Sequence, residues 1–178
     1  MRHPLINGIT RLVLLVTVQF GFLGLSGAVV DVAAQGIHES ATGHAEFVNS
    51  VTGNRARYSV SAIRHQDGTV SGEFEIHAFG PSGAFLFTSH VTITCLTITG
   101  NVARIGGVVD KTVGAGAPPG TEGFITIVDN GQGAQDPPDL ASPAGVGPGT
   151  ATSHCTTGLP RPLFPIERGN IQVRPAGS

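Results

Sequence analysis

Apolar and polar residues alternate with a two-residue period in the middle of the chain. In residues 70–77, Val70, Phe74 and Ile76 are separated by Ser, Glu and His side chains. This period places one set of side chains toward a core and the other toward water. Residues 70–77 are therefore predicted to form a half-buried β-strand.

β-branched and aromatic residues predict further strands on both sides of this one. The expected strands are residues 43–48, 56–64, 84–98, 102–109, 123–129 and 169–173. The pair Asp67-Gly68 is typical of a tight hairpin, so residues 56–64 should pair antiparallel with residues 70–77. Apolar spacing of three and four residues is not sustained anywhere, and no amphipathic helix of useful length is expected.

The longest predicted strand changes phase within its length. Val91, Ile93 and Cys95 share one face, whereas the apolar positions that follow are Leu96 and Ile98. A shift of one residue predicts a bulge or a crossover between sheets.

Seven or eight short strands separated by turn residues predict an all-β fold. We expect an antiparallel β-sandwich, and we keep a closed antiparallel barrel as the alternative. Residues 132–169 are rich in Gly and Pro and predict a long irregular insert. This insert is either pinned to the core or partly disordered.

The first residues have the pattern of a secretory signal peptide. Arg2, His3 and Arg11 precede an apolar run that ends in the small residues Ala33 and Ala34. We predict cleavage after Ala34, which leaves a single domain at residues 35–178 and no membrane span. An uncleaved anchor is the alternative. The expected location is secreted, periplasmic or in the cell envelope.

The cysteine content predicts how the sulfur atoms are used, and the charge narrows the classes of binding partner. The two cysteines, Cys95 and Cys155, lie in the predicted exported part, where a disulfide is the simplest expectation and two free thiols are the alternative. The formal net charge of the chain is −2, and Lys111 is its one lysine. The absence of a basic cluster argues against nucleic acid or an anionic membrane surface as a partner.

Oxygen ligands gather after the strand at residues 123–129. Asp129, Asn130, Asp136 and Asp139 lie on a Gly-containing loop, which could suit a calcium ion. The spacing does not match the twelve-residue helix-flanked calcium loop. In the alternative interpretation these residues end a strand, form a turn and keep the loop soluble.

A second group of polar side chains depends on the next hairpin. If residues 79–83 close it, Glu73 or Glu75 lies within a residue or two of His90 on the outward face. A carboxylate beside an imidazole could support hydrolysis, or contribute to a zinc or copper site if more ligands converged. The sequence has no His-x-His, His-Glu-x-x-His or Gly-x-Ser-x-Gly motif. A solvated strand face explains these residues equally well.

Several segments together resemble a known type of domain. They are residues 58–64, 67–77, 91–103, the Val-Asp-Asn-Gly turn at 128–131 and the Gly-Asn-Ile-Gln-Val ending at 169–173. In their order they are similar to a group of exported bacterial β-rich domains of unknown function, which often lie beside cell-surface repeat modules. The resemblance implies an exported all-β domain, and it carries over no catalytic residue.

We therefore expect an exported, non-enzymatic structural or interaction module without a required cofactor. Its partner would be found at the cell surface or outside the cell. The alternatives are a calcium-stabilised extracellular binding domain that uses Asp129, Asn130, Asp136 and Asp139, and a hydrolase with a carboxylate and histidine face.

Overall fold

The computed structural model describes residues 36–133 and 135–177, and the predicted signal peptide lies outside these residues. Nine strands and one helix follow one another along the chain. They are β1 (Ile37–Val48), β2 (Arg55–His65), β3 (Val70–Phe79), β4 (Phe85–Thr99), β5 (Val102–Gly114), β6 (Glu122–Val128), β7 (Leu140–Ala141), β8 (Gly145–Val146), α1 (Thr150–Thr157) and β9 (Phe164–Arg174).

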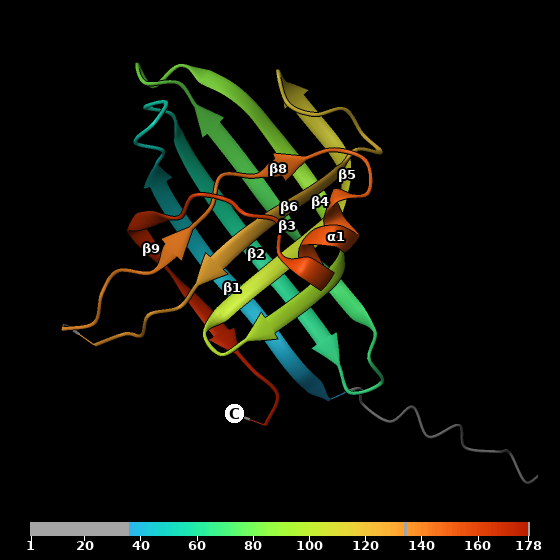
Figure 1. The fold of residues 1–178 in the computed structure, drawn as a ribbon. Helices are drawn as coiled ribbons and strands as arrows, with labels where there is room; N and C mark the ends of the chain where they lie inside the picture. Colours follow the sequence, from blue (N-terminus) through green and yellow to red (C-terminus); the bar gives the residue numbers. More distant parts are fainter. Residues whose placement is uncertain (1–35, 134, 178) are drawn as a thin grey trace, which may run out of the picture. The chain divides into compact units, whose positions relative to one another are not determined.

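The strands form one antiparallel sheet that closes on itself. The order is β5-β4-β3-β2-β1-β9-β7-β6, and β6 pairs back to β5, so hydrogen bonds run around a ring of eight strands (Figure 1). The short β8 pairs with β6 along the edge that β7 also uses. The all-β antiparallel class is confirmed, and the closed barrel is the architecture that the hydrogen bonds describe. The two separate sheets of the favoured sandwich are not formed.

Bending within β4 and β5 explains the closure. Their pairing shifts register between His90 and Val91 and again between Ile93 and Cys95, and each irregularity bends a strand and increases its twist. The curved β5 keeps β4 on one edge and binds β6 along the other from Val102 to Val108. The predicted bulge is therefore confirmed. It turns Cys95 away from the face of Val91 and Ile93, to which simple alternation assigned it.

The predicted hairpin between β2 and β3 is also confirmed. Its register runs from the pair Arg55–Phe79 to the pair Arg64–Val70. Strand β1 begins at Ile37, earlier than expected, because its first residues pair with β2 and its central part also pairs with β9. Strand β9 likewise begins at Phe164, where it pairs with β7.

Inward-facing side chains fill the middle of the barrel. Phe47 and Tyr58 meet edge to face with ring centroids 5.2 Å apart. The largest side chains that are almost fully buried also include Phe74, Leu96, Ile105, Ile125, Ile127, Ile171 and Val91. Side chains thus fill the interior as a packed core, and no open channel runs through it.

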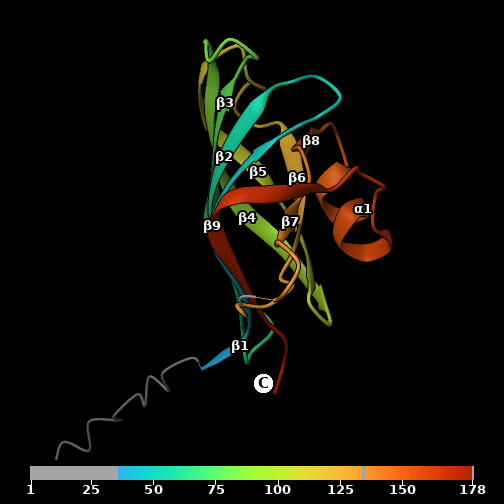
Figure 2. The same ribbon diagram turned by 90° about the vertical axis from the view of Figure 1, so that its left-hand side faces the viewer.

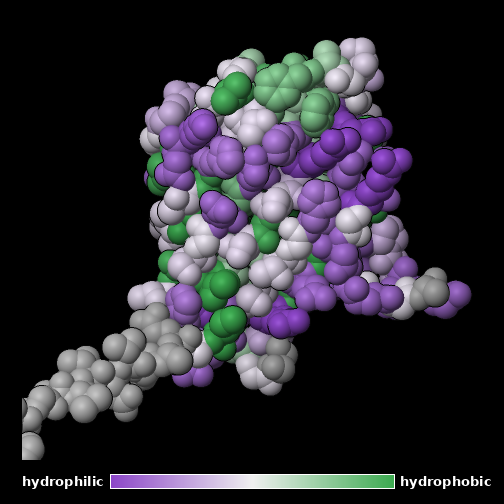
Figure 3. All heavy atoms as spheres, turned by 180° about the vertical axis from the view of Figure 1, so that it is seen from behind, coloured by the Kyte–Doolittle hydropathy of each residue, from purple (hydrophilic) through white to green (hydrophobic). Residues whose placement is uncertain are grey.

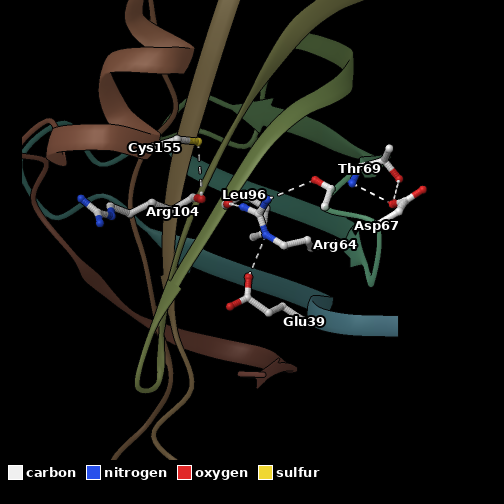
Figure 4. A network of polar contacts seen from close by, with 8 residues as sticks. Glu39, Arg64, Asp67, Thr69, Leu96, Arg104 and Cys155 are labelled. Atoms are coloured by element: carbon white, nitrogen blue, oxygen red, sulfur yellow. Dashed lines mark hydrogen bonds and ion pairs between the residues drawn. The ribbon is translucent and has the colours of Figure 1, made fainter. Parts of the chain in front are cut away.

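Arg64 closes the core at one end of the barrel. It lies at the end of β2 that leads to the turn at residues 66–69, and it donates hydrogen bonds to the Leu96 carbonyl and, over 3.0 Å, to Glu39 Oε2 (Figure 4). In the adjoining turn, Asp67 Oδ1 accepts bonds from the amide and the hydroxyl of Thr69, which lower the pKa of the Asp67 carboxyl. We call this end, with the turns at residues 66–69, 100–101 and 129–139, the far end.

The insert at residues 132–169 is more regular than predicted. It contains β7, β8, α1 and the first part of β9, and α1 packs on the outside of the barrel against β4, β5 and β6 (Figure 2). Gly106 permits this contact, because a Cβ there would lie 2.8 Å from both the Ala151 Cα and the Cys95 Sγ. The buried residues of α1 are Ala151, His154 and Cys155. Their helical spacing gives little apolar signal, which explains why the sequence did not predict a helix.

No helix within the described ranges is long and apolar enough to cross a membrane.

Candidate functional site

The two cysteines form the predicted disulfide. Cys95 in β4 and Cys155 in α1 are bonded, with their Cα atoms 6.2 Å apart. The bond holds α1 against the outer wall and leaves neither sulfur available as a nucleophile or metal ligand.

The predicted calcium ligands bind the protein's own backbone. Asp139, which is 8% exposed, accepts the Asn130 amide through Oδ1 at 2.8 Å and the Ile171 amide through Oδ2 at 3.0 Å. Asp129 likewise accepts the amides of Gly131 and Val173, at 3.0 and 2.9 Å. These two carboxylates thereby attach the end of β6 and the following loop to β9.

The two remaining members of the predicted set complete the loop. Asp136 Oδ2 accepts the Gly133 amide at 2.6 Å, and Asn130 Nδ2 donates to the Pro138 carbonyl at 2.7 Å. In the part of the chain that the structure describes, no three His, Cys, Asp or Glu side chains gather in a way that could hold a metal ion. The geometry favours the turn interpretation of these residues over the calcium site.

The structure brings Glu75, and not Glu73, to His90. Glu75 and His90 are register partners, and Glu75 Oε1 lies 3.5 Å from His90 Nε2 and 2.9 Å from His77 Nε2. Glu73 is instead opposite Thr92. The side chains of Glu75, His77 and His90 are 32–42% exposed on the outer wall of the sheet. Such exposure is typical of a solvated ion-pair cluster.

His154 is a buried polar residue whose role the sequence did not indicate. It is 1% exposed on the side of α1 that faces the barrel, and its ring centroid lies 4.4 Å from that of Phe124. Nε2 contacts the Ile125 carbonyl at 3.1 Å, and Nδ1 accepts the Leu159 amide at 3.1 Å. These partners fit a neutral imidazole protonated on Nε2. Desolvation lowers the pKa of His154.

The end of the barrel opposite the far end is hollowed. We call this end the mouth; it is formed by the turns at residues 49–54, 80–84 and 115–121 and by residues 142–147. Two adjoining recesses with largely apolar walls lie there, with volumes of about 220 Å³ and about 140 Å³. Ile76, Phe87 and Ala144 line both of them.

Carbon atoms dominate the recess walls, and the hydroxyl groups nearby are engaged in hydrogen bonds with the protein. Ser89 Oγ lies 2.9 Å from Thr112 Oγ1, which in turn donates to the Ala117 carbonyl at 2.6 Å. Tyr58 donates to the Ser142 carbonyl at 3.0 Å, and its burial raises the pKa of the phenol. The recesses therefore favour an apolar occupant, since a polar one would lose its hydrogen bonds to water.

Exposed apolar side chains surround the same opening. Four of the six large hydrophobic residues that are exposed in the described ranges lie in the mouth or in the strand ends that adjoin it: Val51, Phe85, Val113 and Val146, which are 51–81% exposed. Hydrophobic atoms gather along this end in Figure 3, above a mixed and largely polar wall. An apolar rim thus borders an apolar recess.

A weak trace of the recess is present in the sequence. Two of the segments that border it consist mostly of Gly and Ala: Gly114-Ala-Gly-Ala117 and Ala144-Gly-Val-Gly147. Small side chains leave space between strands that are fixed by the barrel. Each segment has the composition of an ordinary loop, and only the folded chain places the two around one opening.

Comparisons with protein-family models, with curated proteins and with solved structures found no match. The functional argument therefore depends on the geometry of this chain.

Proposed function

We propose that this protein is an exported, non-enzymatic interaction module that binds a small apolar molecule at the mouth of its barrel. The observation that carries the proposal is the coincidence of an apolar recess with an apolar rim at one end of the molecule. Exposed hydrophobic residues scattered singly need no explanation, but a cluster around a concavity is typical of a binding site.

The architecture supports a small ligand. An eight-stranded barrel has an interior that side chains fill or that holds one small molecule. Here the far end is filled by Arg64 and its partners, whereas the mouth keeps recesses of about 220 and 140 Å³. These volumes lie below the range of roughly 300–1,000 Å³ that is usual for drug-sized ligands. A short chain or a single ring is the expected occupant.

Binding without reaction is supported by the chemistry of the lining. The hydroxyls of Ser89, Thr112 and Tyr58 are engaged with neighbouring protein atoms, and the Glu75, His77 and His90 cluster belongs to the outer wall. Export is supported by the disulfide together with the predicted signal peptide, because disulfides persist in oxidising compartments.

Titration with the neutral fluorescent probe N-phenyl-1-naphthylamine tests the proposal. Ala144 lines both recesses, so Ala144→Phe should fill them and weaken binding by about tenfold or more. Ser59→Phe places the same ring on the outward side of β2, at an exposed position, and should leave binding unchanged. Both variants are first checked for an intact thermal unfolding transition.

Two results would contradict the proposal. One is the absence of saturable binding to the wild-type protein. The other is equal binding to the wild-type and Ala144→Phe proteins, which would place the probe somewhere other than the recesses.

A further inference from the structure

Two arginines lie beside the mouth, at the start of β2. Arg55 lines the smaller recess, and it also lines a cleft of about 500 Å³ on the outer wall, together with Arg57, Phe79 and Pro81. Arg55 therefore belongs to the lip between the apolar interior and the outer wall. A molecule that fills the smaller recess and extends outward would meet this residue.

A nearly buried carboxylate holds both guanidinium groups. Glu46 Oε1 lies 3.0 Å from Arg55 Nη1, and Glu46 Oε2 lies 2.9 Å from Arg57 Nε. The Glu46 side chain is 7% exposed, whereas the two arginine side chains are 44% and 46% exposed. The Arg57 guanidinium also lies over the Phe79 ring, 5.3 Å from its centroid. The arginines are thus ordered before any ligand arrives, which lowers the entropic cost of binding to them.

The charge of this group differs from that of the far end. Two guanidinium groups against one carboxylate leave a positive charge beside the mouth. The far end instead has the carboxylates of Glu39, Asp67, Asp129, Asp136 and Asp139 against the guanidinium groups of Arg64 and Arg174. Near the mouth, Glu122 accepts the Ala151 amide at 2.9 Å. The exposed Glu167 and Arg168 of β9 lie opposite Glu46 and Phe47 and offset each other in charge. An anionic group is therefore attracted to the mouth in preference to the far end.

We propose that the molecule held at the mouth is a short amphiphile with a carboxylate head, whose apolar part occupies the recesses and whose head lies at Arg55. This inference rests on the proposed function and names the class of its ligand. Guanidinium groups bind carboxylates through paired hydrogen bonds, and the small recess volumes suit a short chain. A free carboxylic acid and an acidic phospholipid both carry an anionic head on an apolar chain, and the experiment distinguishes them.

The test measures displacement of N-phenyl-1-naphthylamine by three eight-carbon ligands at pH 7.5 and low ionic strength: octanoate, octanol and octyltrimethylammonium. We expect octanoate to bind about fivefold or more tightly than octanol, and the cation to bind most weakly. Added salt should reduce the difference, because the head group stays near water. Vesicles that contain phosphatidylglycerol form a parallel arm.

Arg55→Gln is the informative variant. It should lower the affinity for octanoate about fivefold or more relative to the affinity for octanol, and saturable binding of the probe shows that the recess is intact. Arg57 remains to pair with Glu46 in this variant, and Arg55→Lys should retain part of the preference. Arg174→Gln removes a charge from the C-terminal end of β9, among the residues that pair with the start of β1, and is the matched control without effect.

The possible failures are distinguishable. Equal affinities for octanoate and octanol in the wild-type protein, or a preference that survives in Arg55→Gln, would overturn the carboxylate assignment while the apolar site stands. Failure of all three ligands to displace the probe would overturn the proposed function as well. Binding to the vesicles without binding of monomeric octanoate would overturn the placement of the apolar part in the recesses.

Discussion

At the scale of single residues, Asp139 illustrates how a carboxylate can hold a fold together. Each of its oxygens accepts one backbone amide, from Asn130 and from Ile171. These amides belong to segments more than thirty positions apart, so one side chain attaches the loop after β6 to β9. A buried acceptor of this kind is costly to replace, because both amides would lose their partner away from water.

Asp139→Asn should therefore lower the free energy of unfolding by about 1–3 kcal/mol. The amide side chain keeps one acceptor oxygen and directs a donor at the second backbone N–H. Urea denaturation of the wild-type and variant proteins measures the difference. Asp136→Asn is the matched control at an exposed position, with an expected change within about 0.5 kcal/mol. Equal losses in the two variants would contradict the structural role of Asp139.

His154 makes stability depend on pH. Its pKa in the folded protein is lower than in the unfolded chain, because burial between α1 and the barrel wall disfavours the charged ring. The unfolded chain therefore binds the proton first as the pH falls. The stabilisation is complete above the unfolded pKa of about 6.5 and is lost progressively below that value.

We expect the thermal midpoint to fall between pH 7.5 and pH 5, and the fall to be smaller in His154→Gln. Gln keeps a donor for the Ile125 carbonyl and does not titrate. Melting curves at a series of pH values, followed by circular dichroism, provide the measurement. An identical pH dependence in both proteins would show that other groups are responsible.

At the scale of elements, glycine positions determine how closely neighbouring strands approach in this barrel. Gly72 in β3 has a φ of +125°, and a Cβ built there would lie 1.7 Å from the Ser61 carbonyl oxygen in β2. A side chain at this position would therefore both strain the backbone and push two paired strands apart.

Gly72→Ala should destabilise the protein more than Gly68→Ala does. Gly68 also has a positive φ, of +84°, but no atom lies within 4 Å of a Cβ built on it. The strain of positive φ alone costs of order 1–3 kcal/mol, and Gly72→Ala adds the clash with β2 to that cost. Chemical denaturation of the two variants compares them. Equal destabilisation would mean that the strand contact relaxes freely.

At the scale of the whole molecule, the disulfide links parts of the chain that are 60 positions apart. Its effect is largest on the unfolded chain, where it restricts a long loop. In the folded protein it keeps α1 on the outer wall, over Gly106 and beside β6.

Reduction should lower the free energy of unfolding by up to about 4 kcal/mol. Protein that has not been reduced should also show no reaction with thiol reagents when it is unfolded in denaturant. A Cys95→Ala, Cys155→Ala double variant should be about as stable as the reduced wild-type protein, and reductant should not change its stability. Two titratable thiols in protein isolated from an oxidising compartment would contradict the bond.

Local patterns determined much of the architecture. Alternation and β-branched residues identified the seven longer strands, Asp67-Gly68 identified the hairpin, and the phase change after Cys95 identified the bulge, because each depends on neighbours in the chain. A single pair of cysteines allowed one disulfide. The sequence alone also brought Glu75 to the neighbourhood of His90, since a hairpin fixes which residues face each other.

Only the tertiary structure decided between sandwich and barrel, because a two-residue period indicates which face of β5 is buried and not which strand binds its second edge. The partners of Asp129 and Asp139 are amides near the other end of the chain. The mouth is likewise assembled from turns that are distant in sequence. Its recess exists because small residues at 114–117 and 144–147 meet around strands whose separation the closed ring sets. No local sequence pattern determines the separation of these strands.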